Sequence, residues 1–129
     1  MTRPVAVSPS EREWTGWEET ERPRRGNVEW KTMISADLTP NNSLSAGYAR
    51  IAPGEELGLH SHPQAEVYVV IAGTAHVQTD GVLQVVETGG AVFIPGGTTH
   101  GCRNHGPKEL RFVYCFPESS VGDVEYRFD

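Results

Sequence analysis

The sequence predicts an all-β fold in a single domain. Its 129 residues are enough for one hydrophobic core and leave no room for a second domain. Its 14 glycines and 9 prolines favour many short strands joined by tight turns over a bundle of helices. Asp80 and Gly81, a pair favoured in two-residue hairpins, lie between two runs of strand-forming residues.

The first segment, residues 1–26, reads as an N-terminal arm, and residues 27–129 read as the folded domain. The arm is charged and contains prolines. Trp14 and Trp17 are three residues apart, which is compatible with a short helical turn. We expect these tryptophans to fix the arm against the domain or a second subunit rather than to stack on a ligand.

The strands of the domain are runs of apolar and β-branched residues bounded by turn formers. In order they are expected at residues 28–34, 44–51, 66–71, 74–79, 82–86, 91–94 and 110–116. In the last run, the even positions are apolar or aromatic and Arg111 faces the other way, so one face of this strand belongs to the core. Residues 91–94 read as a short buried strand, and residues 124–128 alternate as a strand would. Tyr48 and Tyr114 are expected in the core.

Charge and composition exclude several functions. With 11 basic and 17 acidic residues, the formal net charge is −6, which disfavours nucleic acids and anionic membranes as partners. No stretch is apolar enough for a membrane span or a signal peptide, so a cytoplasmic location is expected. The two cysteines, Cys102 and Cys115, do not form a metal or disulfide pattern and are expected as free thiols.

Two stretches carry the residues with chemistry. His60, His62 and Glu66 lie within seven residues, and His100 follows a Pro-Gly-Gly turn further along. Because Pro63 restricts His62 to extended conformations, His60 and His62 are expected on one face of an extended chain. Three imidazoles and one carboxylate suit a divalent transition metal such as Fe, Mn, Ni or Zn better than Ca or Mg. Any one of these histidines alone would be assigned to the core or the surface.

Tyr68 shares the parity of Glu66 in the expected strand, so its side chain should enter the same pocket. The alternative is an aromatic that only fills the interior. Tyr126 lies in the tail, where an aromatic normally covers the end of a barrel. His76 and His105 lack metal-binding neighbours and are expected in solvent, and Asn104 is expected to bond backbone near the site.

Both stretches resemble the two motifs of the cupin superfamily. The matching residues are Gly54, His60, His62, Glu66 and Gly73 in the first motif and Gly89, Pro95, Gly97, His100 and Asn104 in the second. The resemblance implies a single-domain jelly-roll β-barrel, or double-stranded β-helix. It also implies that His60, His62, Glu66 and His100 bind one metal ion inside the barrel.

A narrower resemblance, over residues 26–128, is to the small cupin lyases that split dimethylsulfoniopropionate (DMSP) into dimethyl sulfide and acrylate. It rests on residues 26–31, 36–37, 44–47, 51–54, 65–70, 116–117 and 123–126. It implies that Tyr68 is the general base and that Tyr126 is a second tyrosine of the active site.

The expected function is therefore a metal-dependent lyase acting by β-elimination on a small-molecule substrate. Two alternatives remain open from the residues: an Fe or Mn dioxygenase or isomerase that uses the same ligands, and a non-catalytic cupin that only binds a small ligand. A homodimer is expected, because a barrel of this kind has exposed strand edges and the arm can reach a second subunit.

Overall fold

The computed structural model describes residues 3–128, so residues 1 and 2 of the expected arm and residue 129 of the expected domain lie outside it. Residues 3–128 form ten strands: β1 (Thr15–Gly16), β2 (Glu29–Ile34), β3 (Ser45–Ile51), β4 (Glu56–His60), β5 (Glu66–Ala72), β6 (Thr74–Thr79), β7 (Val82–Glu87), β8 (Ala91–Ile94), β9 (His100–Arg103) and β10 (Leu110–Phe116). The helical elements of the described residues are short: η1 (Pro9–Glu11), η2 (Glu19–Glu21), α1 (Arg22–Arg25) and η3 (Val121–Asp123).

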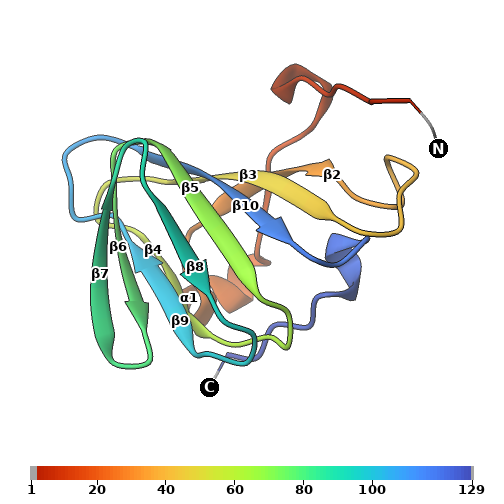
Figure 1. The fold of residues 1–129 in the computed structure, drawn as a ribbon. Helices are drawn as coiled ribbons and strands as arrows, with labels where there is room; N and C mark the ends of the chain where they lie inside the picture. Colours follow the sequence, from red (N-terminus) through yellow and green to blue (C-terminus); the bar gives the residue numbers. More distant parts are fainter. Residues whose placement is uncertain (1–2, 129) are drawn as a thin grey trace.

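The strands form two antiparallel sheets (Figure 1). One sheet has the order β1-β2-β3-β10-β5-β8 and the other has the order β4-β9-β6-β7. Strands distant in sequence are neighbours in both sheets, as in a jelly roll. The prediction of an all-β jelly roll is confirmed.

The core lies between the two sheets and follows the alternation of the strands. On β10, Leu110, Phe112, Tyr114 and Phe116 are all buried, while Arg111 faces outward. On β5, which pairs with β10, Glu66, Tyr68 and Val70 share the inner face and are 4%, 1% and 1% exposed. The predicted parity of Tyr68 with Glu66 is thus confirmed.

The hairpin between β6 and β7 also agrees with the sequence. Asp80 has φ of 48° and Gly81 has φ of 78°, so both central residues adopt the left-handed backbone that a type I′ turn requires. β6 pairs with β7 from Thr74 to Thr79 without a register shift.

Several expectations about single elements are wrong. Trp14 and Trp17 do not lie on a helical turn, because the residues between them form β1 and pair with β2. The tail is not a strand: after η3, only Arg127 forms an isolated bridge, to Ser61. β8 is only half buried, with Phe93 63% exposed, because it is the edge strand of its sheet.

Tyr48 is not in the core. It lies on the outer face of β3, where its ring contacts Trp14 and its hydroxyl accepts a hydrogen bond from Arg111. Tyr114 is buried, as expected. Cys102 and Cys115 are free thiols, also as expected. Within residues 3–128, no helix is both long and apolar enough to cross a membrane.

Candidate metal centre

Three histidines from distant parts of the chain meet between the sheets. His60 ends β4 and His100 begins β9, and the pairing of these two strands sets the residues opposite each other. His62 follows two residues after His60. The ring centroids lie 4.2 Å apart for His60 and His100, 4.9 Å for His62 and His100, and 5.6 Å for His60 and His62. One ligand atom from each histidine lies within 4.8 Å of the others, so the cluster can bind a metal ion.

The orientation of each imidazole is set by the main chain. In every case Nδ1 lies within hydrogen-bond distance of a backbone carbonyl, which can only accept, so Nδ1 carries the proton and Nε2 presents a lone pair. The distances are 2.7 Å from His60 to Gly58, 2.9 Å from His62 to Gln64 and 2.8 Å from His100 to Thr98. This is the tautomer in which histidines bind metals through Nε2.

Glu66 at the start of β5 adds a carboxylate to the cluster. Its Oε1 lies 3.2 Å from Nε2 of His62 and 3.3 Å from Nε2 of His100. Nε2 of His100 is buried and has no hydrogen-bond partner among the residues that the structure describes. Lone pairs that face a carboxylate in a buried site repel each other unless a cation lies between them. The donor set therefore fits a divalent transition metal.

An extra proton on the histidines is the alternative to a metal ion. Burial, with a smaller contribution from the neighbouring His100, lowers the pKa of His60 to about 4, which keeps this imidazole neutral. Burial acts to raise the pKa of Glu66, but where His100 and His62 carry a proton on Nε2, their hydrogen bonds to the carboxylate outweigh burial and lower the pKa. Neutral imidazoles beside an ionised carboxylate are the states in which these groups bind metals.

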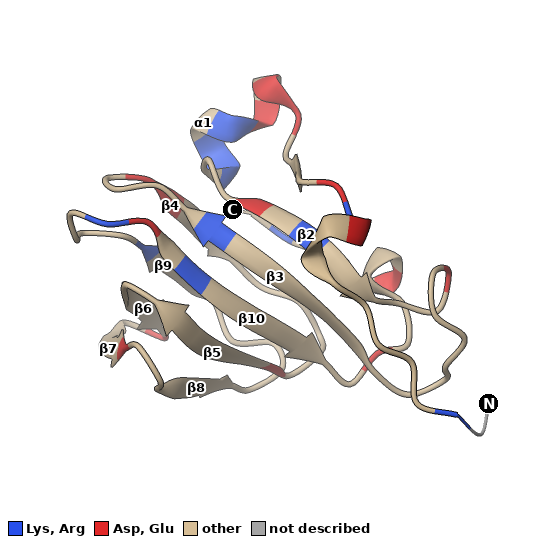
Figure 2. Ribbon diagram, turned by 90° about the horizontal axis from the view of Figure 1, so that it is seen from above, with Lys and Arg blue, Asp and Glu red and all other residues tan. Residues whose placement is uncertain are grey.

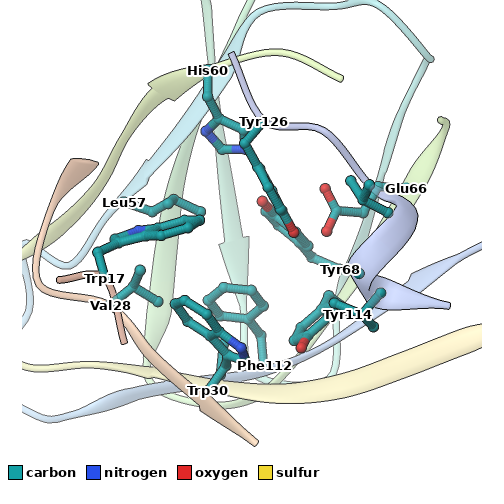
Figure 3. A pocket seen from close by; sticks show the side chains of 14 residues that line it. Trp17, Val28, Trp30, Leu57, His60, Glu66, Tyr68, Phe112, Tyr114 and Tyr126 are labelled. Carbon is teal, nitrogen blue, oxygen red and sulfur yellow. The ribbon is translucent and has the colours of Figure 1, made fainter. Parts of the chain in front are cut away.

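A cavity of about 270 Å³ lies beside the cluster, with His60 and Glu66 in its wall. Tyr68 and Tyr126 line the same cavity, and Figure 3 shows the hydroxyl of Tyr126 directed toward Glu66. The volume is close to the lower limit of roughly 300 Å³ for ligand pockets, so the cavity fits a small molecule.

The protein groups around the two tyrosines do not favour phenolate. Burial, followed by the charge of Glu66, raises the pKa of Tyr68 well above its ordinary value, and the same two causes raise the pKa of Tyr126. A general base is most useful when its pKa lies near the operating pH. A cation at the cluster would oppose the charge of Glu66, which is the largest cause after burial of the raised pKa of both tyrosines.

Sequence reasoning missed the aromatic residues that complete the cavity. Trp17, Trp30, Phe112 and Tyr114 all line it. Trp17 was assigned to fixing the arm, because nothing in the sequence relates residues 14–17 to the metal motifs. Asn104 has its expected role: its Nδ2 donates to the carbonyls of Ile51 and Lys108 behind the site.

Comparison with known proteins gives the family. Residues 47–116 match the cupin domain. The chain is 37% identical over 106 residues to dimethylsulfoniopropionate lyase DddW of Ruegeria pomeroyi, which covers 82% of this chain and 69% of the relative. It is 36% identical over 109 residues to protein SchB of Streptomyces halstedii, covering 81% and 78%.

A solved structure shows the same fold. The crystal structure of a predicted oxalate decarboxylase from Thermotoga maritima superposes with a TM-score of 0.73 at 24% identity, covering 88% of this chain and 99% of that one. The two sheets and the histidine cluster agree with the match of residues 47–116 to the cupin domain. The chain belongs to the cupin family.

Proposed function

We propose that this protein is a metal-dependent lyase that cleaves DMSP into dimethyl sulfide and acrylate by β-elimination. The observation that carries the proposal is the common cavity of Tyr68, Tyr126, His60 and Glu66, which joins two phenols to a metal-binding cluster. The identity of 37% to a DMSP lyase supports the choice of substrate. The metal ligands in this proposal are His60, His62, Glu66 and His100.

The reaction needs one base and one group that accepts developing charge. Tyr68 removes a proton from the carbon next to the substrate carboxylate. The electron pair of that C–H bond forms the new double bond, and the bond between the β-carbon and sulfur breaks with its electrons remaining on sulfur. The products are neutral dimethyl sulfide and acrylate, and the proton on Tyr68 returns to solvent.

A bound divalent metal supplies stabilisation of the negative charge that develops on the substrate carboxylate. The chain's own residues do the rest. Tyr126 lies 5.4 Å from both the His60 and His62 ring centroids, close enough to position the substrate against the cluster. The apolar remainder of the cavity wall keeps water from the reacting atoms.

The test begins with anaerobic purification and metal analysis, followed by gas detection of dimethyl sulfide after DMSP is added. Release of dimethyl sulfide with equimolar acrylate is the expected result. Oxygen uptake with an organic acid, and no dimethyl sulfide, would instead identify the dioxygenase alternative. Tight binding of a small acid without turnover would identify the binding-protein alternative.

We also propose that the protein is a homodimer, with the second copy covering the outer face of β5 and β8. Val69, Ile71 and Phe93 are 38%, 42% and 63% exposed on this face. Figure 2 shows charged residues on the arm, α1, the loops and strands β2, β3, β9 and β10, whereas β5 and β8 are almost free of charge. β8 is also an edge strand, and a neutral apolar face at an edge suits contact with a copy of itself.

A further inference from the structure

The cavity beside the metal centre has two chemically different sides. Figure 3 shows His60, Glu66 and Tyr126 on one side and Trp17, Trp30 and Phe112 on the other. The first side carries the imidazole and the carboxylate of the proposed metal site together with the phenol of Tyr126. The second side carries aromatic rings and aliphatic side chains.

The charged groups of the cavity wall are few among the residues that the structure describes. Glu66 is the only carboxylate among the residues that line the cavity, and none of them is Lys or Arg. A substrate carboxylate therefore has its partner at the metal-binding side. The aromatic side offers no formal charge to an anionic group.

Aromatic faces attract large, weakly hydrated cations. The π-electrons of Trp, Tyr and Phe interact with sulfonium and quaternary ammonium groups. These groups cannot donate strong hydrogen bonds, so the free energy needed to desolvate them is small. Trp17 and Trp30 lie with ring centroids 4.8 Å apart at 61°, so two indoles meet at an angle in the cavity wall. Phe112 packs against Tyr68, at 4.5 Å, and extends this wall toward the general base of the proposed reaction.

We propose that Trp17 and Trp30 form a subsite for the onium end of a zwitterionic carboxylate, and that Trp17 of the N-terminal arm is a specificity-determining residue. The inference rests on the proposed function for the carboxylate end of the substrate. It adds that the arm recognises the onium end of the substrate by its positive charge as well as by its size.

Trp17 is held firmly enough for this role. Its ring packs edge-on against Tyr126 at 5.4 Å and Phe128 at 5.5 Å. The guanidinium of Arg25, which does not line the cavity, lies 4.8 Å from the centroids of both Trp17 and Phe128. The rings of Trp17 and Phe128 therefore already form a cation–π contact with a guanidinium that lies outside the cavity lining.

Trp14 provides a matched control. It is the same residue type on the same arm, but it packs on the outer face of the sheet against Tyr48 and under the guanidinium of Arg50, at 3.8 Å. It does not line the cavity. Its replacement perturbs the arm without changing the proposed subsite.

The experiment compares two ligands of the same shape in metal-loaded protein. One is trimethylammonio-propanoate, and the other is its isostere in which carbon replaces nitrogen, so that the trimethyl end is uncharged while the carboxylate is kept. Calorimetry should show the onium ligand binding roughly tenfold more tightly than the isostere. Equal or tighter binding of the isostere would overturn the proposal, because the aromatic side would then be only an apolar surface.

Variants assign the preference to the indoles. Trp17→Leu keeps an apolar side chain but removes the ring, so the preference for the onium ligand should fall to about a third or less, while Trp14→Leu should leave it unchanged. Equal losses in both variants would show a general effect of the arm and contradict the role of Trp17. Trp30→Leu gives the same test on β2 should Trp17→Leu fail to fold. If the preference is present but DMSP is not cleaved, the subsite stands and the lyase assignment is wrong.

Discussion

Glu66, like His60, connects the histidine cluster to the cavity. Its carboxylate contacts Nε2 of both His62 and His100, and its side chain also lies in the wall that Tyr68 and Tyr126 share. The identities and parity of these residues are visible in the sequence. The meeting of His60 with His100 depends on the pairing of β4 with β9, a long-range contact that no local pattern encodes.

Removal of one imidazole should empty the metal centre. In His60→Ala or His100→Ala we expect loss of stoichiometric metal and a lower Tm, because a cation that binds only the folded chain stabilises it by mass action. This stabilisation is about 4 kcal/mol when free metal exceeds the Kd roughly a thousandfold. Elemental analysis and thermal unfolding measure the two effects.

His105→Ala is the control for this experiment, since His105 is an exposed histidine outside the cluster. It should keep both metal and Tm. One tight metal per chain in the His60→Ala, His100→Ala double variant would show that the metal binds elsewhere.

Loss of the Tyr68 hydroxyl should act on the chemical step alone. Tyr68→Phe keeps the ring packed against Phe112, so fold, metal content and substrate affinity should change little. Turnover should fall by roughly two to four powers of ten, the usual contribution of a positioned acid or base. Rates of dimethyl sulfide release and calorimetric affinities separate the two effects.

Tyr48→Phe, on the outer face of β3, should turn over at the rate of the unchanged protein. Near-normal turnover in Tyr68→Phe as well would reduce Tyr68 to an aromatic that fills the barrel. The general base would then have to be sought among other residues of the cavity.

At the scale of elements, the sequence predicts best where one strand shows its own alternation. The bounds of β10 and β8 agree with the expected residues, as does the hairpin turn at Asp80 and Gly81. β9 was not predicted, because its four residues, from His100 to Arg103, have no apolar pattern and become a strand only by pairing with β4 and β6. The sequence does not predict β1 in the arm for the same reason, because this strand forms only by pairing with β2.

Asn104 connects the end of β3 to the loop before β10. Its buried amide donates to the carbonyls of Ile51 and Lys108, each at 2.8 Å, and its Oδ1 accepts from the backbone of Gly106. Asn104→Ala would leave these buried groups without partners, which should lower the free energy of unfolding by about 3 kcal/mol. Chemical denaturation measures the change.

Asn42→Ala serves as the reference, because Asn42 is exposed in the turn before β3. Its effect should stay below about 0.5 kcal/mol. A similarly small effect in Asn104→Ala would mean that water replaces the lost hydrogen bonds and that the residue does not hold the two segments together.

In the complete molecule, the arm is built into the domain and does not only lie across its surface. The division at residues 26 and 27 stays a prediction, but β1 adds a strand to the larger sheet and Trp17 contributes to the cavity wall. This contribution could not be read from the sequence, since a tryptophan that covers a core and one that lines a cavity have the same local pattern.

The proposed dimer makes a further prediction at this scale. A charge at the centre of the apolar face should separate the copies, so Phe93→Asp should sediment as a monomer while the unchanged protein sediments as a dimer. Val5→Asp is the control, because Val5 is also exposed, at 47%, but lies on the arm. A monomeric unchanged protein, or a dimeric Phe93→Asp, would contradict this interface.

The hydrogen bonds that orient the three imidazoles all end on main-chain carbonyls, and this affects how the site tolerates sequence change. Every amino acid, proline included, supplies a carbonyl, so no single replacement of Gly58, Gln64 or Thr98 deletes the acceptor. In a saturation scan, positions 64 and 98 should accept many residues with the metal retained. The orientation of the three imidazoles therefore does not depend on the side chains at these neighbouring positions. The residues of the surrounding cavity can change while the histidine cluster stays the same.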